Sequence, residues 1–83
     1  MLTRVKESLE KHFASVSIRG DGDSSFVFVE HCRRAVELSW NGTGWWLEFW
    51  DSADDENAPA IAERTVGTEA EAVDAIKEWL IRR

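Results

Sequence analysis

The chain contains 83 residues, of which 43% are hydrophobic and 31% are charged, and its formal net charge is −6. We expect residues 1–83 to form one small domain, because this length suits one hydrophobic core and not two. The negative charge argues against binding to nucleic acid and to anionic membrane surfaces, both of which select basic proteins.

The first predicted element is an amphipathic helix over residues 2–13. Leu2, Val5, Leu9 and Phe13 recur at steps of three and four residues, which is the spacing of one helical face. A helix of this length is marginal in water on its own, so we expect its apolar face to cover a sheet.

Two strands are predicted next, over residues 14–19 and 26–30. In the first, Val16 and Ile18 alternate with polar residues, and a loop rich in glycine and aspartate over residues 20–24 follows it. The second strand is apolar on both faces, so we expect it to be central in the sheet or partly covered on both sides.

The sequence leaves the next boundary open. Either a tight turn lies at residues 31–33, or one long bulged strand runs over residues 26–40, and neither glycine nor proline marks the turn. We favour the turn, because the alternative strand would be far longer than the usual length of about 5–6 residues.

The strongest local signal is a hairpin over residues 33–51. Apolar residues occupy every second position on both sides of Asn41-Gly42, a pair that is typical of a tight hairpin turn. One face of the hairpin is therefore apolar, and the other mixes glutamates with Trp46 and Trp50.

Two registers of this hairpin keep its apolar faces together. A two-residue turn at Asn41-Gly42 pairs Leu38 with Trp45, whereas a four-residue loop pairs Leu38 with Leu47. We favour the two-residue turn. Its predicted pairs on the outer face are Arg33 with Trp50 and Glu37 with Trp46.

The C-terminal part is predicted to contain a polar loop over residues 52–59, a strand over residues 61–66 and a helix that ends near residue 81. Thr68 and Glu71 match a capping box, in which each side chain accepts a hydrogen bond from the backbone amide of the other residue. The buried stripe predicted for this helix contains Ala72, Val73, Ile76 and Leu80.

The order of these elements is a helix, four or five strands, and a second helix. Strands joined by short loops pair antiparallel, and helices at both ends of the chain can cover one face of the sheet. The sequence therefore predicts an α+β two-layer sandwich, in which N- and C-terminal helices flank an antiparallel sheet.

Two short groupings resemble reactive or ligand-binding motifs, and we interpret both as structural. His31 and Cys32 are neighbours, but adjacent residues of a strand point to opposite faces. Residues 21–25 resemble the start of a calcium loop, but the later ligand positions do not match. We therefore expect no catalytic residue, no metal ion and no cofactor.

The cellular compartment is predicted from two features that the sequence lacks. Cys32 is the only cysteine, so no intramolecular disulfide can form, and the sequence contains no apolar run that resembles a signal peptide or a membrane span. We expect a cytoplasmic protein.

Tryptophan and carboxylate side chains gather on the predicted outer face and in the loop that follows it. Exposed aromatic patches usually mark binding surfaces. The candidate interaction surface contains Arg33, Glu37, Trp46, Glu48, Trp50, Asp51, Asp54 and Asp55.

The functional hypothesis is a non-enzymatic interaction module. Its partner would be a second copy of the chain or a basic protein, in the second case as a small acidic antagonist of the immunity-protein type. The alternative is a small-ligand-binding protein or enzyme, with a pocket between sheet and helices that contains His12 or His31.

Overall fold

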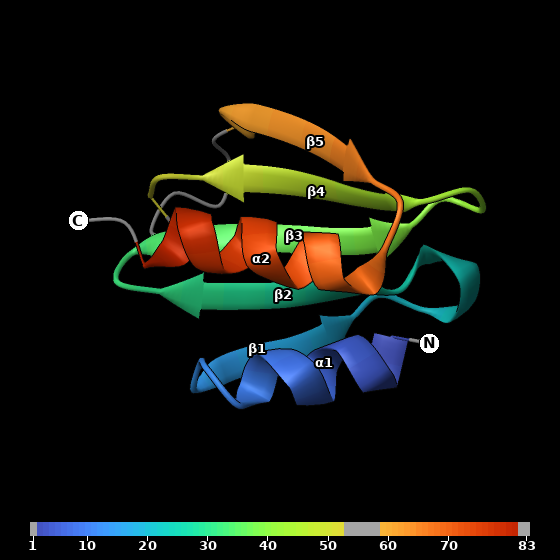
Figure 1. Ribbon diagram of the computed structural model, residues 1–83, viewed down its shortest axis with the longest axis horizontal. Helices are drawn as coiled ribbons and strands as arrows, with labels where there is room; N and C mark the ends of the chain where they lie inside the picture. Colours follow the sequence, from blue (N-terminus) through green and yellow to red (C-terminus); the bar gives the residue numbers. More distant parts are fainter. Residues whose placement is uncertain (1, 53–58, 82–83) are drawn as a thin grey trace.

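The computed structural model describes residues 2–52 and 59–81 and shows an antiparallel sheet with helices packed against it (Figure 1). The strands follow one another in the order β1-β2-β3-β4-β5. The predicted α+β two-layer arrangement is confirmed. The elements are α1 (Leu2–Glu10), β1 (Ser15–Arg19), a 3-10 turn η1 (Gly22–Ser24), β2 (Phe26–His31), β3 (Arg34–Trp40), β4 (Trp45–Trp50), β5 (Ala62–Val66) and α2 (Glu69–Leu80).

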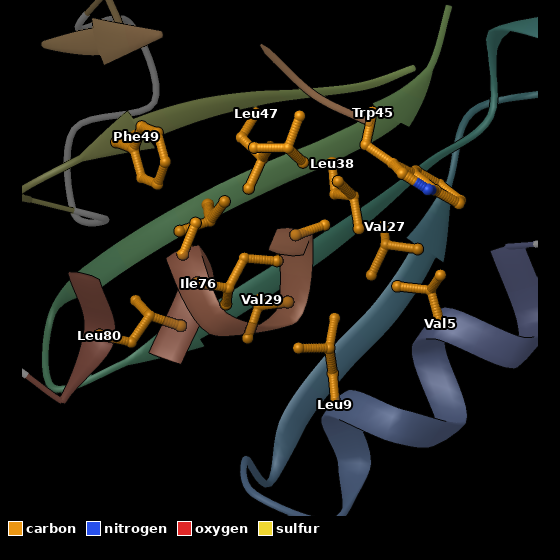
Figure 2. Packing of buried hydrophobic residues seen from close by; sticks show 14 of the residues in the cluster. Val5, Leu9, Val27, Val29, Leu38, Trp45, Leu47, Phe49, Ile76 and Leu80 are labelled. Atoms are coloured by element: carbon orange, nitrogen blue, oxygen red, sulfur yellow. The ribbon is translucent and has the colours of Figure 1, made fainter. Parts of the chain in front are cut away.

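Both helices lie on the same face of the sheet, α1 beside β1 and α2 across the central strands (Figure 1). Their apolar side chains point into one cluster with alternate residues of the strands (Figure 2). This burial supplies the main favourable free energy of a fold of this size. The fully buried members are Val5, Leu9, Val27, Val29, Val36, Leu38, Leu47, Ala72 and Ile76.

The N-terminal helix ends earlier than its sequence pattern predicts. Helix α1 stops at Glu10, and the amides of His12 and Phe13 both bond to the carbonyl of Leu9 at 2.9 Å. The predicted end at residue 13 is wrong, because the chain closes a turn there. Phe13 is nevertheless buried in the core, so the apolar spacing continues through the turn.

The C-terminal helix begins at the predicted capping box. The Glu71 amide donates to the Thr68 hydroxyl at 3.1 Å, and this hydroxyl donates to the Glu71 carboxylate at 2.9 Å. Of the predicted stripe, Val73 is only half-buried, and Ala75 is buried in addition. The motif therefore identified the start of α2 correctly.

A tight turn separates β2 from β3, as the favoured interpretation predicted, but it contains two residues and not the predicted 31–33, because His31 belongs to β2. His31 pairs with Arg34, and the turn consists of Cys32 and Arg33. Both residues have positive φ, 50° and 70°, which is the geometry of a type I′ turn. Neither residue is glycine or asparagine, so the turn holds two side chains in a conformation that they rarely adopt.

The register of the β3–β4 hairpin differs from the favoured prediction. Trp40 pairs with Trp45 and Leu38 with Leu47, so the connection is the four-residue loop. The cause is the Asn41 side chain, whose Oδ1 accepts the amides of Thr43 at 3.0 Å and Gly44 at 2.9 Å. An asparagine that caps a loop in this way stabilises the longer connection.

This register changes the pairs on the outer face. Glu37 lies opposite Glu48 and not opposite Trp46, and Ala35, not Arg33, lies opposite Trp50. The predicted Arg33–Trp50 and Glu37–Trp46 pairs are therefore wrong. Two carboxylates now share one cross-strand position.

The Cys32–Arg33 turn gives a stability prediction at one exposed site. Cys32→Asn should raise the free energy of unfolding by about 0.5–1 kcal/mol, because asparagine tolerates positive φ better than other side chains. Cys32→Val should lower it, since a β-branched residue is strained there. Urea unfolding of the reduced proteins measures both. Equal stability of the two variants would contradict the strain argument.

Candidate functional site

The face of the sheet that points away from α1 and α2 is the candidate site, and we call it the open face. Among the described elements, no helix lies on it (Figure 1). Side chains alternate between the two faces along each strand, so the sequence neighbours of the buried core residues point to this side. Across the sheet it carries Ser17, Arg19, Phe26, Phe28, Ala35, Glu37, Ser39, Trp46, Glu48, Trp50, Glu63 and Thr65.

A line of glutamates crosses three neighbouring strands of the open face. Glu37 on β3 lies opposite Glu48 on β4, and Glu48 lies opposite Glu63 on β5. We call these three residues the carboxylate row. Within the described part of the chain, no lysine or arginine forms an ion pair with them. Like charges in directly opposite positions destabilise a sheet.

Two members of the row, Glu37 and Glu48, have raised pKa values, and burial is the largest cause in both. Burial raises the pKa of Glu37 above its usual value of 4.5, the charge of Glu48 raises it further, and Arg19 lowers it. Burial also raises the pKa of Glu48, and the charge of Glu63 adds to this effect. The ionised carboxylates of Glu37 and Glu48 therefore cost the folded protein stability at neutral pH.

Aromatic rings lie beside the carboxylate row. Trp46 is 38% exposed, and Trp50, two residues beyond Glu48 on the same strand, is half-buried. On β2, Phe28 lies opposite Glu37, and the guanidinium carbon of Arg19 lies 4.1 Å from the centre of the Phe28 ring. This part of the face therefore already holds one arginine against an aromatic ring.

One end of the open face is hollowed between η1 and the β3–β4 hairpin. We call this hollow, of about 290 Å³, the acidic pocket. Serine hydroxyls and Asn41 form part of its wall. Its carboxylates and rings come from Asp23, Glu37, Glu48, Phe26, Trp40 and Trp46.

The structure brings together only part of the predicted interaction surface. Glu37, Trp46, Glu48 and Trp50 share the open face. Arg33 lies in the β2–β3 turn, and Asp51 is exposed directly after β4. Asp54 and Asp55, in the predicted polar loop over residues 52–59, lie outside the described residues.

Sequence reasoning missed Glu63 and Asp23. Glu63 belongs to the predicted strand over residues 61–66. Its position opposite Glu48, however, depends on the β4–β5 register. Asp23 was assigned to a loop, and the 3-10 turn brings it to the acidic pocket. Spacing in the sequence gives no direct signal for either position.

His31, Cys32 and Trp79, which the sequence also singles out or places near this region, lie away from the open face. The His31 ring lies 5.4 Å from the Phe13 ring, and Cys32 is exposed in its turn. Trp79 lies on the helix side, where its indole N–H donates to the Trp50 carbonyl at 3.0 Å. Trp79 therefore adds no ring to the open face.

Neither a metal-binding cluster nor a membrane-spanning helix occurs among the described residues. No group of three or more histidine, cysteine, aspartate or glutamate side chains there could hold a metal ion. No described helix has the length and apolar character needed to cross a bilayer.

Comparison with known protein families, curated proteins and solved structures found no match to this chain. The chemistry of the open face is therefore the basis for assigning a function.

The carboxylate row gives a prediction about stability and pH. Glu48→Gln should stabilise the protein at pH 7 by up to about 1 kcal/mol, because it removes the central charge of the row. Since the folded-state pKa lies above 4.5, wild-type stability should rise relative to the variant as pH falls toward that value. Thermal unfolding from pH 7 to pH 4.5 measures the difference.

Glu7→Gln is the matched control for this measurement. Glu7 is exposed on α1, away from the open face, and its substitution changes the net charge equally. It should leave stability nearly unchanged at both pH values. A Glu48→Gln variant that is less stable than the wild type at pH 7 would contradict the argument.

Proposed function

We propose that this protein is a non-enzymatic interaction module whose open face binds a basic surface of a partner protein. The observation that carries this proposal is the carboxylate row, which lies on a face without a described helix and has no described ion-pair partner. A partner that places cationic side chains beside Glu37, Glu48 and Glu63 would remove the repulsion among them. Binding would therefore recover stability that the free protein lacks.

The surroundings of the row suit a protein surface. Trp46 offers an exposed ring beside charged groups, and tryptophan is enriched among the residues that dominate binding energy. The net charge of −6 would also accelerate encounter with a basic partner. A small acidic antagonist that covers the basic functional surface of another protein fits both features.

Charge argues against self-association through the open face. A two-fold dimer brings the same patch of both copies together. Two carboxylate rows would then face each other at neutral pH, which costs free energy. We therefore propose a heterotypic partner. A cytoplasmic location is part of the proposal, and the exposed thiol of Cys32 suits a reducing compartment.

The alternative of a ligand pocket between sheet and helices has less support. Val29, Leu38 and Ile76 are fully buried there and belong to one continuous cluster (Figure 2). His12 is exposed, and the ring of His31 packs against Phe13. The hollow that His12 lines contains residues of α1, of the turn after α1 and of α2 but no strand residue, so it is not the predicted pocket between sheet and helices.

Two triple variants with the same net charge test the proposal. The row variant is Glu37→Gln/Glu48→Gln/Glu63→Gln, and the control is Glu7→Gln/Asp74→Asn/Glu78→Gln on exposed helix positions. Tagged forms of the wild type and both variants are used for capture from source cells. A partner with a basic surface should be retained by the wild type and the control, lost with the row variant, and released by salt.

Binding of the purified partner is then measured by calorimetry. We expect at least a tenfold weaker affinity for the row variant and less than a threefold change for the control. Equal binding by the two triple variants would contradict docking on the open face. A wild-type dimer in light scattering at pH 7 that persists in the row variant would favour self-association at another surface.

A further inference from the structure

The acidic pocket indicates what the partner presents to the open face. Its volume of about 290 Å³ lies just below the range typical of sites for drug-sized ligands. A pocket of this size suits one inserted side chain. It is continuous with the carboxylate row, because Glu37 and Glu48 belong to both.

The lining of the pocket selects a cation with a flat apolar surface. Asp23 from η1 and Glu37 and Glu48 from the sheet provide negative charge, while Phe26 and Trp46 provide ring surfaces. Aromatic faces attract cations, and carboxylates pair with them. The carboxylates do not form a cluster that could hold a metal ion, so an extended organic cation fits better than a compact one.

We propose that the acidic pocket receives the side chain of one arginine of the partner protein. The inference depends on the proposed function, because it names the group that the basic partner inserts. A guanidinium is planar, stacks on indole and bonds to carboxylates with two parallel N–H groups, whereas a lysine ammonium does not. The same face already holds one such stack, since the guanidinium carbon of Arg19 lies 4.1 Å from the centre of the Phe28 ring.

The test uses N-acetyl-arginine amide and N-acetyl-lysine amide as probes of the isolated protein. Each is titrated while the indole N–H signal of Trp46 and the backbone amide signals of Ser39 and Glu48 are followed by NMR. We expect saturable shifts at these positions with the arginine probe, and at least threefold weaker binding of the lysine probe. Equal affinities, or shifts confined to other parts of the protein, would overturn the inference.

Asp23→Asn and Asp21→Asn provide a matched pair. Both aspartates are exposed in the β1–β2 connection, but only Asp23 lines the pocket. Asp23→Asn should weaken the arginine probe at least threefold, whereas Asp21→Asn should leave it unchanged. The same result for both variants would show that general charge attraction, and not the pocket, binds the probe.

A variant that fills the acidic pocket distinguishes failure of the arginine inference from failure of the proposed function. Ser39→Leu adds an apolar side chain to the pocket wall and leaves the carboxylate row intact. If it abolishes both probe binding and high-affinity partner binding, the arginine inference is supported. If the partner still depends on the row but is insensitive to Ser39→Leu and Asp23→Asn, docking on the open face stands and the arginine inference fails. If the partner is insensitive to the row variant as well, both fail.

Discussion

Burial of one face of the sheet under two short helices is the constraint that determines the rest of the structure. Leu38 and Leu47 are paired and fully buried on that face. Because side chains alternate along strands, a shift by one residue would expose them, so the parity of β3 and β4 is fixed. The same constraint places Glu37 and Glu48 on the other side. The apolar core thus determines where the charged face lies.

The sequence predicted the fold through local signals with direct physical causes. Alternation identified β1, β3 and β4, and the capping box identified the start of α2. The turn at Cys32 and Arg33 was favoured only through strand length, since neither residue prefers positive φ. Its detailed geometry depends on the pairing of β2 with β3, which holds the two residues in place.

The candidate site was predicted less completely because it depends on register. Connections of two and four residues give β3 and β4 the same parity, so the apolar pattern cannot choose between them. The choice came from the Asn41 side chain, which caps the longer loop. Glu48 could be placed on the outer face from sequence, but its two acidic neighbours required the register of both adjacent strand pairs.

The order of the strands has a consequence for how the chain reaches this structure. Each strand hydrogen-bonds only to strands that are its neighbours in the sequence. Most of the sheet can therefore form by closing short loops, which costs little chain entropy and favours rapid folding. The contact between α1 and α2 joins the two ends of the chain. That contact is the step with the longest loop to close, so the sheet can assemble as successive hairpins before the helices complete the core.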